Sequence, residues 1–192
     1  TLFRSGRIGY RGYDLAVGDR LYFHLLHDFQ SGHGLKVFSV EKIKAFKWHV
    51  VIYLDPETVA DYAPILSALP VDYVIDHMGT VKAEKGLDQP NFNALLDLAK
   101  RDQKCWVKVC GFERASAKGA PFHDAVPFGA KLVETIPDRV LWGTDWPHPN
   151  LKDHMPDDGL LVDFIPQIAV TPSLQQKLLV DNPTRLYWPE LK

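Results

Sequence analysis

The chain has 192 residues, a formal net charge of −2 and 46% hydrophobic residues, a composition typical of a globular protein. Its basic residues are scattered and its apolar runs are shorter than a membrane span, so we expect neither a nucleic-acid nor a membrane partner. One domain over residues 1–192 is expected. Cys105 and Cys110 match no metal or redox spacing, which predicts buried reduced thiols and a cytoplasmic protein.

The first part of the chain carries weak structural signals. Residues 1–19 have no clear period and are expected to be irregular. Residues 20–26 can be interpreted as a strand and residues 40–46 as a helix.

From residue 48 onward, strand and helix patterns alternate. The strand segments are rich in β-branched and aromatic residues, and the helical segments carry apolar residues at helical spacing. Strands are expected at residues 48–54, 71–77, 105–110 and 140–143. Helices are expected at residues 56–69, 92–99, 124–136, 159–168 and 171–179.

This alternation predicts an α/β fold with parallel strands joined by right-handed crossovers. A closed (β/α)₈ barrel has eight strands, whereas this sequence shows four clear strands and one weak one. Such a barrel also typically needs about 250 residues. The pattern therefore favours part of a TIM-type barrel that lacks the first strands, with an open sheet as the alternative. An incomplete barrel exposes sheet edges, so we expect self-association through them.

Polar side chains follow the predicted strands where each strand ends. These are Tyr53, His77, Arg114 and Asp145, the last in a turn between two tryptophans and followed by His148. The carboxyl ends of parallel strands share one edge of a sheet, so we expect these groups to meet there. A carboxylate, an imidazole and a guanidinium suit the hydrolysis of an anionic ester or lactone, in which they activate water, polarise the carbonyl and bind a carboxylate.

Each of these residues also has a structural interpretation. Asp145 could cap the following turn, and His77 could be a hydrogen-bonded core histidine. Tyr53 could only pack, and Arg114 could pair with its neighbour Glu113.

A metal centre needs more ligands than the sequence offers. A catalytic zinc site normally has three protein ligands, and His77 and Asp145 supply two. The chain contains no His-x-His pair. We therefore expect no metal and no cofactor.

Several segments together resemble the amidohydrolase superfamily, and within it the lactonase branch. The resemblance is carried in order by residues 48–53 (WHVVIY), 75–79 (IDHMG), 106–109 (WVKV), 141–150 (LWGTDWPHPN) and 179–187 (LVDNPTRLY). It implies a distorted (β/α)₈ barrel that hydrolyses a small carboxylated lactone in the degradation of aromatic compounds. It also implies a reaction without metal, although neighbouring branches bind a single divalent ion such as zinc.

The resemblance implies roles for individual residues. Asp145 matches the general base for the attacking water, and His77 matches the histidine that polarises the scissile carbonyl. The positions that match substrate contacts are Tyr53, Arg114, His148 and Arg20, of which Arg20 would bind a substrate carboxylate.

The chain also departs from the family. Thr80 stands where relatives usually have an arginine after His-Met-Gly, and the loss of a charge-assisted hydrogen bond would cost roughly 1.5–3 kcal/mol of substrate binding. Thr80, as a pocket position, thus favours a sugar-lactone hydrolase or a metal-dependent relative as the alternative. The first strand with its His-x-His motif has no counterpart, so a truncated protein that binds a carboxylate without catalysis is the third alternative.

Overall fold

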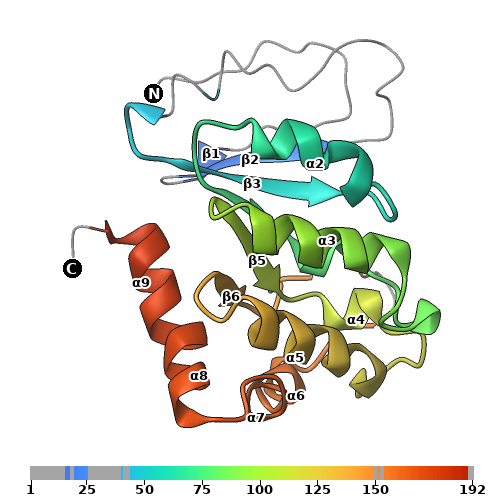
Figure 1. Cartoon of the computed structure of the whole chain (residues 1–192). Coiled ribbons are helices and arrows are strands. Elements are labelled where there is room, and N and C mark those ends of the chain that lie inside the picture. The colour runs from blue at the N-terminus through green and yellow to red at the C-terminus, as the bar shows by residue number, and fades with distance from the viewer. Residues whose placement is uncertain are drawn as a thin grey trace.

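The structure is a computed structural model that describes residues 16–17, 20–25, 40, 44–148, 151 and 154–189, the first two segments by their backbone. Six strands form one sheet in chain order (Figure 1). They are β1 (Ala16–Val17), β2 (Arg20–Leu25), β3 (His49–Leu54), β4 (Tyr73–Ile75), β5 (Cys105–Val109) and β6 (Val140–Trp142). All neighbours from β2 to β6 pair in parallel, as predicted, and β1 pairs antiparallel with β2.

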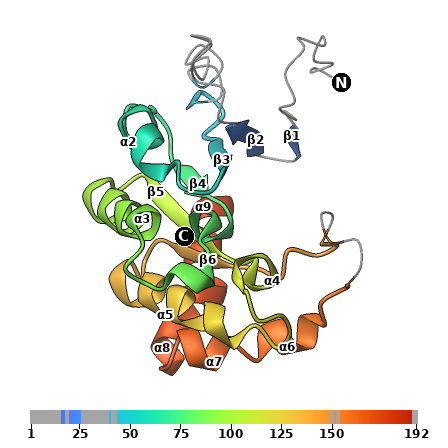
Figure 2. The same ribbon diagram turned by 90° about the vertical axis from the view of Figure 1, so that its right-hand side faces the viewer.

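Helices follow the strands and cover one face of the sheet. The three longest are α2 (Val59–Ser67), α3 (Pro90–Arg101) and α5 (Val126–Thr135), which form a column along one side of the strands (Figure 2). Proline occupies the first turn of α3 and α5, where a missing N–H costs no hydrogen bond. The alternation of strand and crossover helix thus has the predicted form.

The C-terminal part differs from the predicted helices. The segment expected over residues 159–168 is split into α6 (Asp158–Val162) and α7 (Ile165–Ile168). After α8 (Pro172–Gln176), a π-helical turn (Lys177–Asp181) leads into α9 (Asn182–Tyr187), which periodicity did not predict. A short helix, α4 (Phe112–Ala115), also lies in the loop after β5.

The main core lies between the sheet and its helix layer. Val50, Ile52 and Leu54 alternate along β3 toward this side and are fully buried. The opposite face carries a smaller cluster of Val51, Val74, Trp106 and Leu141, against which Leu186 and Tyr187 pack. Apolar side chains therefore cover both faces, which explains the nearly continuous apolar runs of the strands.

Helix α9 is fixed next to the start of β6. The Asn182 side chain donates from Nδ2 to the carbonyl oxygens of Pro137 at 2.8 Å and Val140 at 2.9 Å. The Arg185 guanidinium lies 4.9 Å from the centre of the Trp106 ring. These contacts hold the C-terminal segment at the end of the sheet where the strands begin.

Three expectations concern the N-terminal segment. The weak strand is confirmed as β2, and residues 16–17, expected to be irregular, form β1. The rest of residues 1–19 lies outside the described residues, and so do residues 41–43 of the helix expected over residues 40–46.

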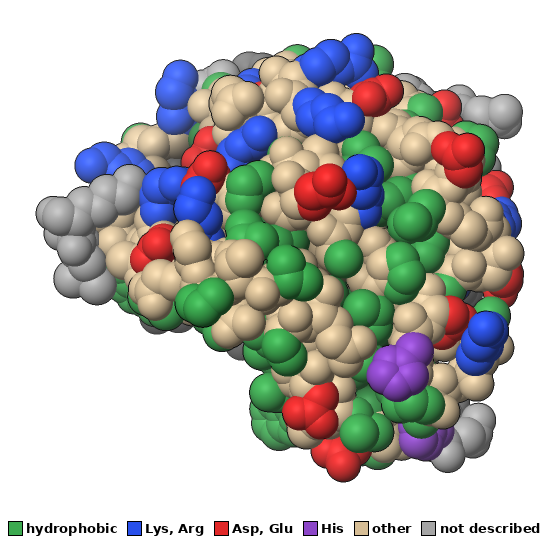
Figure 3. Space-filling model, turned by 60° about the horizontal axis from the view of Figure 1, so that its bottom comes forward, with side chains coloured by type: hydrophobic (Ala, Val, Ile, Leu, Met, Phe, Trp, Pro, Cys, Tyr) green, Lys and Arg blue, Asp and Glu red, His purple; other side chains and the backbone are tan. Residues whose placement is uncertain are grey.

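The surface seen from below mixes all types of side chain. Figure 3 shows a band of hydrophobic side chains across the middle of this face, with acidic and basic side chains around it. No helix in the described part of the chain has both the length and the apolar character of a membrane span. Self-association and the one-domain organisation stay predictions.

Candidate functional site

Four of the predicted site residues come together where the strands end. Nε2 of His77, after β4, lies 3.7 Å from Oδ1 of Asp145, after β6. The ring of Tyr53, in β3, stands edge-on to the His77 ring with 5.4 Å between centroids. Arg114, in α4, places its Nη2 against Oδ2 of Asp145. The parallel pairing of the strands therefore brings these side chains together, as the sequence predicted.

His77 begins a strained turn. From His77 to Thr80 the backbone keeps positive φ angles of 48°, 51°, 66° and 56°, a region that favours glycine, yet only Gly79 is one. Asn91 holds this turn, because its Nδ2 donates to the Gly79 carbonyl at 2.9 Å while its Oδ1 accepts from the Val59 N–H at 3.1 Å. The turn is thereby tied to the start of α2 and α3, and the His77 ring is directed from a fixed backbone.

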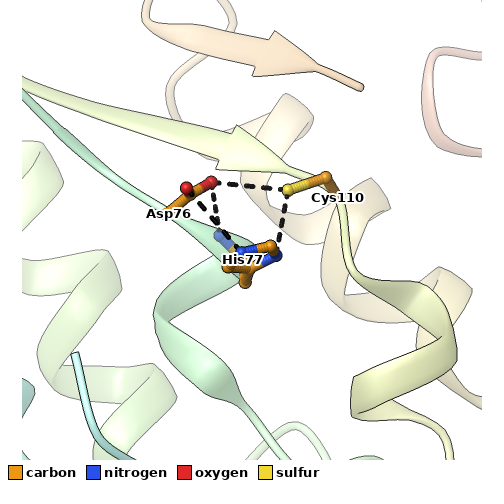
Figure 4. Close-up of side chains that lie close together, drawn as sticks. All are labelled: Asp76, His77 and Cys110. Carbon is orange, nitrogen blue, oxygen red and sulfur yellow. Dashed lines mark hydrogen bonds and ion pairs between the residues drawn. The ribbon is translucent and has the colours of Figure 1, made fainter. Parts of the chain in front are cut away.

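Two buried polar side chains also lie against the His77 ring, those of Asp76 and Cys110 (Figure 4). Nδ1 lies 3.3 Å from Sγ of Cys110, and Nε2 lies 3.7 Å from Oδ2 of Asp76. Oδ1 of Asp76 pairs with Nζ of Lys108 at 2.9 Å and accepts the backbone N–H of His77 at 3.1 Å. Asp76 therefore has a cationic partner of its own beside the imidazole.

Burial and charge set the protonation states in this group. Burial lowers the pKa of His77, although the carboxylates of Asp76 and Asp145 oppose the shift, so the imidazole is neutral near pH 7. Burial would raise the pKa of Asp76, but the Lys108 ammonium holds it below its ordinary value. Burial raises the pKa of the Cys110 thiol well above its ordinary value, and the Asp76 carboxylate adds to the shift.

The loop after β5 brings Arg114 to the site. Gly111 precedes α4 with φ of 74°, and a Cβ atom built there would lie 2.8 Å from Nδ1 of His77. Only glycine therefore permits both this turn and the position of the imidazole. The carbonyl of Gly111 accepts the N–H of Arg114 at 3.0 Å, which starts the helix that carries the guanidinium.

Glu113 and His148 form a buried pair behind Arg114 and Asp145. Nδ1 of His148 lies 3.7 Å from Oε1 of Glu113, and its Nε2 lies 3.3 Å from Oδ1 of Asp158. The side chains of Glu113 and His148 are 1% and 0% exposed, and burial raises the pKa of Glu113. Because the His148 ring is enclosed by these acids, we propose no direct substrate contact for it.

The Thr80 hydroxyl is already engaged by the backbone. Its Oγ1 lies 3.0 Å from the Leu54 carbonyl oxygen and 2.7 Å from that of Gly79, and it donates its single proton to one of these acceptors. Thr80 therefore does not replace the donor that an arginine would offer here. Lys82, two residues later, donates from Nζ to the backbone carbonyl oxygen of Arg114 at 3.4 Å.

The structure corrects the assignment of Arg20. Arg20 pairs with His49 at the start of β3, whereas Leu25 pairs with Leu54 at its end. The backbone of Arg20 therefore lies at the edge of the sheet where the strands begin, roughly 16 Å along the strand from the opposite edge. We remove it from the candidate site.

Four residues around the site were not predicted to belong to it: Asp76, Lys108, Cys110 and Glu113. Strand periodicity contains a signal for two of them, since Trp106 and Lys108 lie on one face of β5 and Cys110, directly after the strand, continues the same spacing. A lysine within an otherwise buried strand indicates a buried acid as its partner.

The donor groups do not fit a zinc site as they are arranged. Two sets of potential ligands exist in the described part of the chain: Asp76, His77 and Cys110, and Glu113, Asp145 and His148. Each contains a carboxylate that already has a cation, Lys108 on Asp76 and Arg114 on Asp145. A divalent ion would have to share that carboxylate with an ammonium or a guanidinium, so no step of the chemistry below is routed through a metal.

Comparison with known proteins gives consistent results. A family model described as amidohydrolase matches residues 11–188. The chain is 53% identical over 157 residues to a 2-pyrone-4,6-dicarboxylate hydrolase of Comamonas testosteroni, a match that covers 78% of this chain and 52% of that protein. It is 39% identical over 142 residues to a 4-sulfomuconolactone hydrolase of Rhizobium radiobacter, which covers 73% of this chain and 47% of that protein.

A solved structure shares the fold. The crystal structure of a candidate 2-pyrone-4,6-dicarboxylic acid hydrolase from Pseudomonas putida matches with a TM-score of 0.67 at 29% identity, over 91% of this chain and 64% of that one. The chain spans about half the length of the curated relatives it matches. These similarities confirm the resemblance to the lactonase branch and the barrel-type α/β fold that the sequence predicted.

Proposed function

Because the chain belongs to the amidohydrolase family, we propose that it hydrolyses the ring ester of a small anionic lactone. The observation that carries this proposal is the arrangement around Asp145. One of its oxygens, Oδ2, contacts the Arg114 guanidinium, and the other, Oδ1, faces Nε2 of His77 at 3.7 Å. A base, a neutral imidazole and a cation thus converge on one small region.

The proposed reaction starts with water bound to Asp145. Oδ1 is the oxygen that Arg114 leaves open, so it accepts a proton as the water oxygen attacks the lactone carbonyl carbon. Nε2 of His77 donates a hydrogen bond to the carbonyl oxygen, on which negative charge develops. The ring C–O bond then breaks, and the Asp145 carboxyl returns its proton to the leaving oxygen.

The substrate is proposed to carry at least one carboxylate. Arg114 uses Nη2 for Asp145 and its buried Nε faces Glu113 at 3.6 Å, so we assign Nη1 to a substrate carboxylate. Lys82, whose Nζ is bound to the backbone carbonyl of Arg114, adds a second positive charge to this region. The names of the two curated relatives, a pyrone dicarboxylate hydrolase and a sulfomuconolactone hydrolase, fit a lactone with more than one anionic group. We place this activity in the cytoplasm, since both cysteines are free buried thiols.

Turnover and binding should be measured together on this chain. Opening of 2-pyrone-4,6-dicarboxylate destroys the conjugated ring, so its ultraviolet absorbance should fall in the presence of the protein. Isothermal titration with the same compound and with 4-sulfomuconolactone reports binding without turnover. Saturable binding without hydrolysis would contradict the catalytic proposal and favour the carboxylate-binding alternative, and the absence of both would contradict the substrate class as well.

A further inference from the structure

Cys110 is a buried polar group of this site for which the reaction above has no use. It follows β5 directly, is 1% exposed, and lies against His77 and Asp76 (Figure 4). Its Sγ is 3.3 Å from Nδ1 of His77 and 3.5 Å from Oδ1 of Asp76. A thiol has one proton, so the thiol can donate to only one of these two acceptors.

The surroundings of Asp76 favour His77 as the acceptor. Oδ1 of Asp76 already accepts from Lys108 at 2.9 Å and from the His77 backbone N–H at 3.1 Å. Sγ is also closer to Nδ1 than to this oxygen. The thiol proton therefore belongs on the line from Sγ to Nδ1.

The other nitrogen of the ring leads to the same conclusion. Nε2 lies 3.7 Å from Oδ2 of Asp76 and 3.7 Å from Oδ1 of Asp145. If Nδ1 carried the proton, the bare lone pair of Nε2 would face two carboxylate oxygens, which is electrostatically unfavourable. With the proton on Nε2 the contacts are attractive, and Nδ1 is left as the acceptor that the thiol requires.

We infer that Cys110 is a positioning residue, whose thiol donates to Nδ1 of His77 and holds the imidazole neutral with its proton on Nε2. This role rests on the proposed function, because the Nε2 proton is the one that His77 offers to the lactone carbonyl. Without the thiol, Nδ1 is open to a second proton that both neighbouring carboxylates would stabilise. The resulting imidazolium would be held by Asp76 and Asp145 and withdrawn from the substrate.

The charged groups that face His77 come from three strands and one helix, and a fourth strand adds an aromatic ring. The charged groups are Asp76 after β4, Lys108 on β5, Arg114 in α4 and Asp145 after β6, and the ring is that of Tyr53 in β3. Two carboxylates and two cations therefore oppose one another around the ring, and the thiol is the group that touches Nδ1 itself. Burial keeps Cys110 a thiol, so it can act as a donor.

The direct test is ¹⁵N NMR of histidine-labelled protein, which separates a protonated from an unprotonated ring nitrogen and needs no turnover. We expect His77 to show a protonated Nε2 and an unprotonated, hydrogen-bonded Nδ1 at neutral pH. In Cys110→Ala the Nδ1 signal should move toward that of a nitrogen without a hydrogen bond, and the His77 titration should shift to higher pH. Cys110→Ser keeps a donor of similar size and should restore the wild-type spectrum.

Kinetics supply the second readout and Cys105 the control. On the lactone, Cys110→Ala should lower kcat roughly fivefold to tenfold, the effect of one neutral hydrogen bond, with KM unchanged and with rescue by Cys110→Ser. Cys105→Ala removes the other buried cysteine, which faces the main core, and should leave the His77 spectrum and kcat unchanged. A wild-type spectrum with Nδ1 protonated, or a Cys110→Ala spectrum identical to wild type, would overturn the inference even if no lactone is hydrolysed.

Discussion

His77 and Asp145 lie far apart in the sequence, yet Nε2 of the first is 3.7 Å from Oδ1 of the second. The distance is longer than a hydrogen bond, so neither group is fully committed to the other in the absence of substrate. Arg114 contacts the second oxygen of Asp145 and leaves Oδ1 as the oxygen that faces the imidazole. The pair is therefore arranged so that both members can contact the same third group.

The carboxylate of Asp145 should matter for rate far more than for folding. Asp145→Asn keeps the shape of the side chain and an acceptor for Arg114 but removes the base. We expect kcat to fall about 10²–10⁴-fold, the usual contribution of a general base, with a melting temperature within a few degrees of wild type. Asp97→Asn, an exposed position in the middle of α3, is the matched control. Parallel losses of rate and of thermal stability would count against a catalytic role.

An arginine at position 80 should restore binding of a second substrate carboxylate. The Thr80 hydroxyl is held by the Leu54 and Gly79 carbonyls, so it offers the substrate no proton. Thr80→Arg should lower KM for a pyrone dicarboxylate about tenfold to a hundredfold, the value of one charge-assisted hydrogen bond. Thr80→Gln has similar reach without charge and should give little gain. If both variants have the wild-type KM, Thr80 does not face the substrate.

Which parts of the site the sequence predicts depends on the kind of information each residue carries. The ends of strands can be predicted from a sequence, so the sequence predicts that His77, Asp145, Arg114 and Tyr53 lie close together. The prediction for Arg20 is wrong: the resemblance implied a site residue, but the register of β2 against β3 puts its backbone at the edge of the sheet where the strands begin. The sequence alone cannot give the register that exposes such a conflict.

His148 shows a second limit of sequence reasoning. It stands three residues after Asp145, which made it a reasonable pocket residue. In the structure the backbone N–H of His148 donates to the Asp145 carbonyl oxygen at 2.7 Å. This tight turn directs the His148 ring inward, toward Glu113 and Asp158. The direction of a side chain within a turn depends on backbone angles that residue spacing does not reveal.

The Lys108–Asp76 pair should be costly to break on one side only. Lys108→Met leaves a buried carboxylate without its cation, and we expect the free energy of unfolding at pH 7 to fall by about 3–5 kcal/mol. Because the pKa of Asp76 is lowered in the fold, its stabilisation is present above about pH 3.9 and is lost as the pH falls through the folded value. Urea unfolding at several pH values measures both effects. The double variant Asp76→Asn with Lys108→Met should recover much of the loss, and a double variant no more stable than Lys108→Met would refute the pairing.

Protonation of His77 should also make folding stability depend on pH. Its folded pKa is lowered, so below about pH 6.5 the unfolded chain binds the proton more readily than the folded one. Stability should therefore rise with pH between the folded pKa and about 6.5, where the unfolded group titrates. NMR should find the midpoint of His77 below that of an unperturbed histidine. The difference in stability between wild type and His77→Gln should vary with pH in this window, and a flat difference would contradict the assignment.

Gly111 should be required by the position of the imidazole as well as by its own backbone angle. Gly111 and Gly119 have nearly the same φ, 74° and 73°, so alanine at either position meets a similar backbone strain of about 1–2 kcal/mol. A Cβ at Gly111 would lie 2.8 Å from Nδ1 of His77, whereas one at Gly119 meets nothing within 4 Å. We therefore expect Gly119→Ala to lower stability alone, and Gly111→Ala to lower stability further and to reduce kcat as the ring is displaced. Melting curves and steady-state rates for the two variants separate strain from displacement, and equal effects of the two substitutions on kcat would mean that the close approach of Gly111 does not set the position of His77.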